Sequence, residues 1–171
     1  MKILFVSQHY RPEPFRLSDI CEDLVERGHE VTVLTGIPNY PEGKIYADYR
    51  NKQNRRETIE GVTVFRSYTI PRGKSTLHRI LNYFSFAISS SIGVLLGQYK
   101  AKDGSEFDCV FVNQSSPVMM AWAGMAYKNK YKKPLFLYCM DVWPDSLTVG
   151  GVKQDSLIFR SEEHTSELQS P

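Results

Sequence analysis

The sequence predicts an α/β fold, with a mostly parallel sheet covered by helices on both faces. Three observations support this prediction. Short apolar segments alternate with amphipathic helical segments, most of the apolar segments end in polar loops, and no internal repeat or low-complexity stretch interrupts the order. Such alternation is typical of parallel strands whose connecting helices pack on the sheet.

The first part of the chain predicts a βαβ unit. Residues 2–7 form an apolar strand, and a loop that contains two prolines keeps the backbone extended up to Arg16. Apolar side chains then recur at helical spacing over residues 17–25, and Gly28 fits the position that ends such a helix. A second strand follows at residues 31–34, so we expect a right-handed crossover.

The middle of the chain predicts one strand and one long helix. Residues 35–43 form a loop with turn-forming glycines and prolines, and residues 44–60 are polar and charged, as in a mobile excursion. Alternating residues at 61–66 predict a strand. A helix is expected from Ser75 to about Lys100.

The long helix contains an uncharged run at residues 80–99, which is long enough to cross a membrane. Four serines, an asparagine and a glutamine make the run poorly apolar, so a buried or interface helix is the favoured interpretation. A peripheral membrane contact through residues 72–99 stays open because basic residues precede the run beside several aromatic residues. The basic residues are Arg72, Lys74, His78 and Arg79.

The last part predicts strand, helix and strand. A short strand at residues 108–112 ends in a polar loop, in which Ser116 as N-cap and Pro117 at the first helical position begin a helix that reaches Lys128. Residues 135–140 form an apolar run typical of a strand buried on both faces. Two carboxylates, a tryptophan and a proline follow it directly.

Polar loops follow four of the predicted strands, at residues 7–16, 35–43, 113–117 and 139–146. The carboxyl ends of parallel strands share one edge of a sheet, where open α/β folds bind their ligands. We therefore expect the polar side chains of these loops to gather in one crevice. The candidate residues are His9, Arg16, Asn39, Tyr40, Asn113, Asp141 and Asp145.

Composition and motifs exclude several classes of function. The net charge of +2 is too small to indicate a nucleic-acid partner, and the three cysteines lie in apolar segments, as reduced thiols of a cytoplasmic protein do. The first apolar run turns polar at Ser7, too early for a signal peptide. The sequence lacks a dinucleotide fingerprint, a phosphate-binding P-loop, a hydrolase nucleophile elbow and metal-ligand spacing. We expect no cofactor and no bound metal.

The last twelve residues, 160–171, resemble the translation of a sequencing-library adapter. We exclude them from the fold as an artefactual tail. The prediction is a domain of residues 1–159, truncated at this point, in a natural protein that continues past Phe159.

Four segments carry a resemblance to a known family. They are ILFVSQHYRP at 3–12, GHEVTVLTGIPNYP at 28–41, GVTVFR at 61–66 and DVWPDS at 141–146. Residues 1–159 resemble the N-terminal half of a family-4 glycosyltransferase of the GT-B architecture, and most of all the branch that builds bacterial surface polysaccharides. The GHEVTV motif occurs in many α/β proteins, but its combination with PNYP and DVWP is more specific.

The resemblance implies two facing Rossmann-like domains, of which the first binds the acceptor and the second binds a nucleotide sugar. It implies transfer with retention at the anomeric carbon and no required metal, so the nucleotide sugar is a co-substrate. The acceptor would be a lipid-linked sugar or a polysaccharide at the inner membrane face. Without the donor domain, this chain is expected not to turn over a nucleotide sugar.

The resemblance also implies roles for single residues. It places Asp141 close to the reacting centre, where a carboxylate orients the acceptor hydroxyl or takes its proton. The other candidates would bind the acceptor. Many relatives carry a glycine pair near the donor phosphates in the first loop, but residues 12–16 contain no glycine, which leaves Arg16 as that loop's candidate phosphate contact.

Other interpretations of the same residues stay open. Asp141 and Asp145 also fit turn or cap positions that bond local backbone N–H groups, and Asn39 and Tyr40 fit turn chemistry. A non-catalytic, doubly wound binding or regulatory module is the alternative function. A second α/β half encoded beyond Phe159 would favour the transferase, and a nearby stop codon would favour the module.

Overall fold

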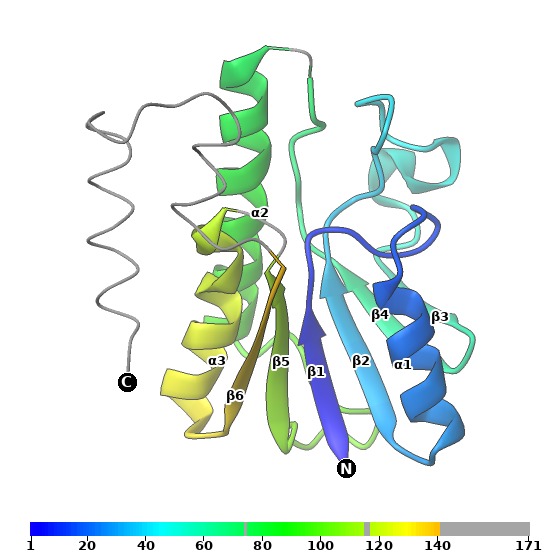
Figure 1. The fold of residues 1–171 in the computed structure, drawn as a ribbon, viewed down its shortest axis with the longest axis vertical. Helices are drawn as coiled ribbons and strands as arrows, with labels where there is room; N and C mark the ends of the chain where they lie inside the picture. The colour runs from blue at the N-terminus through cyan, green and yellow to red at the C-terminus, as the bar shows by residue number, and fades with distance from the viewer. Residues whose placement is uncertain (74, 115–116, 141–171) are drawn as a thin grey trace. The chain divides into compact units, whose positions relative to one another are not determined.

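The computed structural model describes residues 1–73, 75–114 and 117–140. Met1–Tyr138 form one compact unit. Six strands in this part of the chain form one sheet in the order β3-β4-β2-β1-β5-β6 (Figure 1). Their bounds are β1 Lys2–Val6, β2 Glu30–Thr35, β3 Arg56–Ile59, β4 Val62–Arg66, β5 Cys109–Gln114 and β6 Leu135–Cys139. β1 pairs in parallel with β2 and β5, and β2 pairs in parallel with β4. β3 pairs antiparallel with β4 at the edge.

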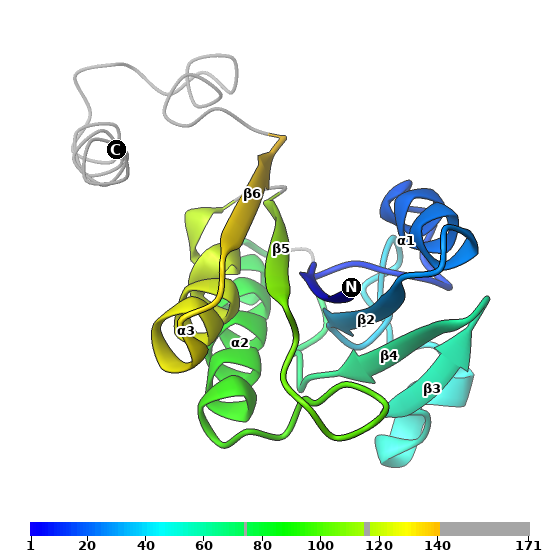
Figure 2. The same ribbon diagram turned by 90° about the horizontal axis from the view of Figure 1, so that it is seen from below.

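Helices cover both faces of the sheet, as Figure 2 shows. Helix α1 (Leu17–Glu26) lies on one face, and helices α2 (Thr76–Leu95) and α3 (Trp122–Tyr131) lie on the other. Two short 3₁₀ helices, η1 (Ala47–Lys52) and η2 (Val118–Ala121), lie in the connections. The predicted α/β class, a mostly parallel sheet between helices, is confirmed.

The alternation of side chains along β1 divides the core into two layers. Ile3 and Phe5 are buried in the layer that contains α1, while Leu4 and Val6 are buried in the layer that contains Phe86 of α2. Because β1 lies in the middle of the sheet, both sets are enclosed. Its carboxyl end is therefore held firmly where the polar loop begins.

The helix ends follow the sequence signals. Gly28 adopts φ +83° and donates its N–H to the carbonyl of Val25, which confirms the predicted end of α1. The side chain of Ser75 accepts the N–H of His78 and begins α2. α2 ends at Leu95, earlier than the predicted Lys100, because Gly97 turns the backbone left-handed at φ +70°.

Two predictions in the connections were wrong. The stretch 44–60 was expected to be a mobile loop without a strand, but it contains η1 and strand β3, which adds an antiparallel edge to the sheet. Pro117 was expected at the first position of an α-helix, but it precedes the 3₁₀ helix η2, and α3 begins only at Trp122. The proposed cap at Ser116 lies outside the described residues.

The prediction that the strand after Pro134 is buried on both faces was also wrong. Among the described strands β6 lies at the edge of the sheet, and most of its side chains are exposed, with Phe136 at 53%. An apolar run indicates a strand, but it does not say whether helices and neighbouring strands enclose that strand.

Candidate functional site

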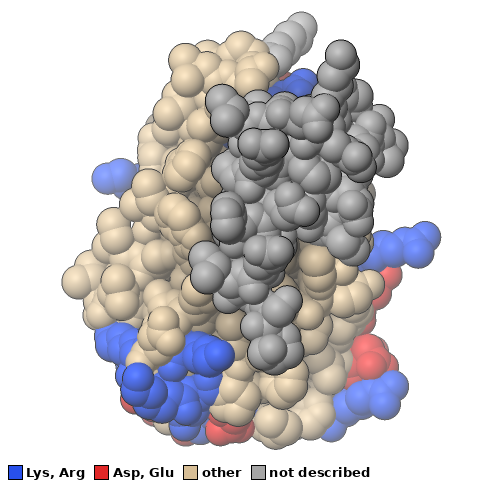
Figure 3. Space-filling view, turned by 60° about the vertical axis from the view of Figure 1, so that its left-hand side comes forward, with Lys and Arg blue, Asp and Glu red and all other residues tan. Residues whose placement is uncertain are grey.

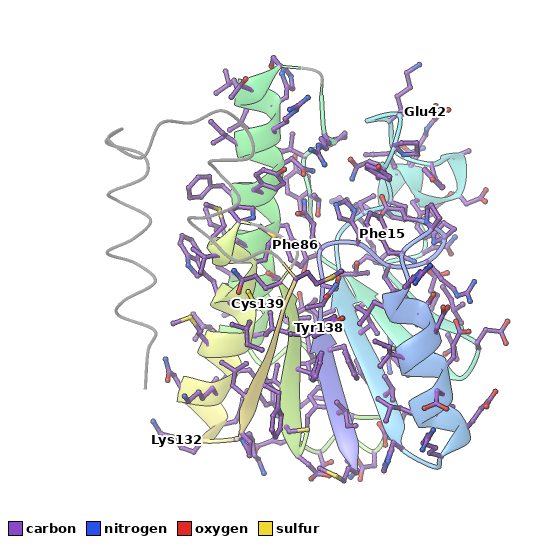
Figure 4. The ribbon with its side chains drawn as sticks, in the orientation of Figure 1. Phe15, Glu42, Phe86, Lys132, Tyr138 and Cys139 are labelled. Atoms are coloured by element: carbon purple, nitrogen blue, oxygen red, sulfur yellow. The ribbon has the colours of Figure 1, made fainter. Side chains whose placement is uncertain are left out.

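The loops that follow β1, β2 and β4 meet above the carboxyl edge of the sheet, at the top of Figure 1. In Figure 4, Phe15 marks this edge, and Lys132 lies at the opposite end of the molecule. The loop after β4, residues 67–75, was not among the predicted site loops. We refer to the groups that these loops bring together as the rim.

Glu13 is the centre of the rim. Its side chain is almost fully buried, and its Oε1 accepts the backbone N–H groups of both Asn39 and Tyr40 at 2.7 Å. Its Oε2 lies 2.8 Å from Nδ1 of His9. One carboxylate thus joins the loop after β1 to the loop after β2, and it satisfies three groups that would otherwise be buried without partners.

His9 is fixed by this contact and by its aromatic neighbours. Because a carboxylate only accepts hydrogen bonds, Nδ1 of His9 carries the hydrogen of this bond. Nε2 is then the second ring nitrogen, which the bond to Glu13 does not use. The imidazole stacks on Phe15 at 4.7 Å between centroids, and the edge of Tyr40 lies 5.8 Å away. Among the described residues, Nε2 of His9 has no hydrogen-bond partner. A side chain held in one orientation with one free ring nitrogen is suited to bind a hydroxyl group.

Asn39 ties the rim to the loop after β4. Its Nδ2 donates to the carbonyl of Ile37, and its Oδ1 accepts the N–H of Arg72 at 2.8 Å. Gly43, at φ +70°, donates its N–H to the carbonyl of Asn39, and a Cβ there would collide with the carbonyl oxygen of Arg72. Asn39 is buried, and both polar atoms of its amide are hydrogen-bonded, so it holds the loops of the rim together.

Gln8 and Asn82 connect the rim to α2. Nε2 of Gln8 donates to Oδ1 of Asn82 at 2.7 Å, and Nδ2 of Asn82 donates to the carbonyl of Ile70 at 2.6 Å. Both side chains are buried. The asparagine in the uncharged helical run is thus a structural link between α2 and the loops of the rim.

Asn113 lies at the end of β5, next to the loop after β1. Its Nδ2 donates to Oγ of Ser7 at 3.2 Å, and that hydroxyl donates to the carbonyl of His9 at 2.9 Å. Oδ1 of Asn113 is buried, and it has no hydrogen-bond partner among the residues that the structure describes. A buried amide oxygen of this kind is expected to have a partner, so Asn113 offers an acceptor for a ligand hydroxyl.

Arg16 lies apart from this network. It precedes α1 and is exposed, and it contributes to an open hollow of about 330 Å³ that Arg11, Phe15 and Asp19 also line. Arg11 is bound through two nitrogens to the carboxylate of Glu22. Within the described part of the chain, Arg16 has no ion-pair partner, so its charge is available to an anion in the hollow.

Asp141 and Asp145, the predicted catalytic and acceptor-binding carboxylates, lie outside the described residues. The structure brings His9, Asn39 and Tyr40 into one cluster and connects Asn113 to it through Ser7. It leaves Arg16 on the outer side of the same loop.

The buried thiol and phenol beneath the rim are not reactive groups. Burial raises the pKa of the Cys21 thiol to about 12, and burial also raises the pKa of Tyr10. Both groups therefore stay protonated at neutral pH, when a thiol is a poor nucleophile. The rim offers hydrogen-bonding and aromatic groups rather than a covalent nucleophile.

Sequence reasoning missed three residues that build the rim, namely Glu13, Arg66 and the backbone of Arg72. Arg66 ends β4, and its side chain is 1% exposed. Its guanidinium pairs with Glu57 and donates to the carbonyls of Arg11 at 2.6 Å and Gly36 at 3.4 Å. The sequence gives one sign that Glu13 has a structural role: it is a charged residue that stands between two prolines in the first loop.

Known proteins resemble this chain in sequence and in fold. No protein-family model matches the chain. Over 96 residues, 53% of the chain, it is 38% identical to the putative colanic acid biosynthesis glycosyl transferase WcaI of Escherichia coli K12. The chain is similar to part of a glycosyltransferase. The alignment covers 23% of the E. coli protein.

The second match is a solved structure, the crystal structure of CalG4, the calicheamicin glycosyltransferase. It superposes on 94% of this chain and 40% of CalG4 with a TM-score of 0.51 and 15% sequence identity. At that identity the match shows the fold alone. The chain spans less than half of either protein. The match to WcaI supports the resemblance to part of a glycosyltransferase, and the match to CalG4 supports the fold.

Proposed function

We propose that this chain is the N-terminal, acceptor-side part of a retaining, family-4 glycosyltransferase of the GT-B type. The observation that carries the proposal is the rim, where Glu13 orders His9 and the backbone of residues 39–40 at the carboxyl edge of a parallel sheet. Open α/β sheets bind ligands at this edge. The sequence similarity to WcaI supports glycosyl transfer as the class of reaction.

In this proposal, each rim residue makes a different contact with the substrates. Nε2 of His9 and Oδ1 of Asn113 bind acceptor hydroxyls, and the partly exposed rings of Phe15 and Tyr40 give a surface on which a sugar ring stacks. Arg16 supplies a positive charge for a phosphate of the donor or of a lipid-linked acceptor. Asp141 and Asp145 follow β6 in the sequence, and we assign Asp141 the orientation or deprotonation of the acceptor hydroxyl.

The donor, a nucleotide sugar, would be bound mainly by a second domain beyond Phe159. We infer that residues 160–171 are not part of the natural domain and that the chain alone does not transfer sugar. The colanic acid role in the name of the E. coli relative favours a polysaccharide or lipid-linked acceptor. Such an acceptor places the enzyme in the cytoplasm, at the inner membrane face.

Sugar transfer by the complete protein tests this function, with labelled nucleotide sugars and membrane extracts as acceptors. We expect transfer by the complete protein and none by the present chain. His9→Ala should lower kcat/KM for the acceptor at least about tenfold, the value of one lost hydrogen bond of ~1.4 kcal/mol. His29→Ala is the matched control, because His29 lies at the amino end of β2, opposite the rim.

Two results would contradict the proposal. One is the absence of transfer with every nucleotide sugar supplied to the complete protein. The other is equal kcat/KM for His9→Ala and His29→Ala, which would leave the transferase but remove the rim from its mechanism.

A further inference from the structure

Helix α2 presents a continuous apolar stripe to the outside. Six large apolar side chains recur at intervals of three or four residues, and each is between 37% and 63% exposed. We refer to them as the α2 stripe. They are Leu77, Leu81, Phe84, Ile88, Ile92 and Leu95.

Several polar side chains of α2 are hydrogen-bonded within the protein. Asn82 is buried against Gln8, and Ser89 donates to the carbonyl of Tyr68 in the loop after β4. Ser90 and Ser91 donate to carbonyls of the preceding helical turn. These polar side chains are therefore satisfied inside the protein, while large apolar side chains of the same helix are exposed. A surface helix usually has the reverse pattern, with its apolar side chains facing the core.

Helix α3 widens the apolar surface. Trp122 is 42% exposed and meets Phe84 edge to face, with 6.1 Å between the ring centroids, and Met125 is exposed one turn further along. In the part of the chain that the structure describes, no helix has the length and hydrophobicity of a membrane span. Trp122 and Met125 extend the exposed apolar surface from α2 onto α3.

The charge around the stripe has one sign. The sequence contains no Asp or Glu from Val62 to Lys102 and none from Cys109 to Met140. Arg72 precedes α2 and Arg79 lies in its first turn, while Lys130 of α3 donates to the carbonyl of Leu95 at the other end of α2. Outside the grey residues, the face in Figure 3 is mostly uncharged, and most of its lysines and arginines lie toward the lower end, where some acidic residues also lie.

We propose that the α2 stripe, with Trp122 and Met125, docks this chain on an anionic membrane surface. An amphipathic helix with an apolar face and basic ends lies in the interface of a bilayer that contains acidic lipids. Each Lys or Arg close to such a surface adds attraction, and any acid would oppose it. A contact with a second copy or with another part of the protein would also use the apolar stripe. Such a contact would not explain why α2 and α3 both lack Asp and Glu, whereas an anionic membrane surface would repel acidic side chains.

Vesicle flotation tests this inference with the 171-residue chain itself, and it does not depend on sugar transfer. The chain should bind vesicles of phosphatidylethanolamine with about one-third phosphatidylglycerol and should bind neutral phosphatidylcholine vesicles weakly, with added salt weakening the binding. The double variant Ile88→Gln/Ile92→Gln should lower the partition coefficient about tenfold or more, and Arg79→Gln should lower it by a smaller factor.

Ile20→Gln is the matched control, since Ile20 is an exposed isoleucine, 42% accessible, on α1 at the other face of the sheet. Circular dichroism confirms that each variant is folded. Failure of the wild-type chain to bind anionic vesicles would overturn the inference, as would equal binding by the stripe variant and Ile20→Gln. Sedimentation that shows a dimer lost on substitution of the stripe, without vesicle binding, would assign the stripe to a second copy.

Discussion

Replacing Glu13 with alanine is expected to lower the free energy of unfolding by about 3 kcal/mol, because two backbone N–H groups and the imidazole of His9 lose their acceptor inside the protein. The loss should be seen in urea denaturation of the 171-residue chain. It should also release the loop that follows β2, since Asn39 and Tyr40 have the carboxylate as their backbone partner. Hydrogen exchange of these two amides should therefore speed up more than that of the strands.

Glu42→Ala is the matched control for this substitution. Glu42 is an exposed glutamate in the loop after β2, the loop that Glu13 binds, as Figure 4 shows. Its replacement by alanine should change the free energy of unfolding by less than about 0.5 kcal/mol. Glu13→Gln separates the carbonyl acceptor from the charge: it can still accept from the backbone, but it turns an amide NH₂ toward His9. Its effect should lie between those of the other two variants. Equal stability of Glu13→Ala and Glu42→Ala would show that the carboxylate does not join the two loops.

The second large effect is expected at Arg66. Its buried guanidinium pairs with Glu57, lies 4.5 Å from the ring centre of Tyr49 and binds the carbonyls of Arg11 and Gly36. Arg66→Ala leaves a carboxylate and two carbonyls without that partner, and removal of one member of a buried pair typically costs about 3–5 kcal/mol. Denaturant midpoints of the purified chain measure this loss.

Arg27→Ala provides the contrast on α1. Arg27 and Asp23 form an ion pair four residues apart, and both side chains are largely exposed. A pair of this kind contributes about 0.3–0.5 kcal/mol. If both arginine variants lost the same stability, the carbonyl contacts of Arg66 would not hold the loops after β1 and β2 together.

The parts of the fold that repeat a local pattern could be predicted from the sequence. Residues 3–6 and 31–34 are short apolar runs, and they form the parallel strands at the centre of the sheet. Gly28 ends α1 because a left-handed residue there costs glycine no steric strain. The shared edge of the loops followed from strand direction alone, which is why His9, Asn39 and Tyr40 were chosen together.

The groups that organise the rim could not be predicted this way. Glu13 stands between two prolines in a polar loop, and its partners are backbone N–H groups 26 and 27 residues away. Arg66 ends a strand, where a charged residue is usually exposed. The exposure of β6 also depends on its place at the sheet edge, which the apolar run does not encode. Each of these features is set by tertiary contacts rather than by local sequence.

We infer that the rim at the carboxyl edge of the sheet binds a sugar acceptor. The most direct measurement is a titration of the ¹⁵N-labelled chain with a sugar diphosphate that carries a short, water-soluble lipid chain, followed by amide chemical shifts. We expect the largest changes in amide chemical shift at His9, Tyr40 and Asn113, and no change at Lys132 at the opposite end of the molecule. Shifts confined to α2, or to the edge strand β3, would contradict it.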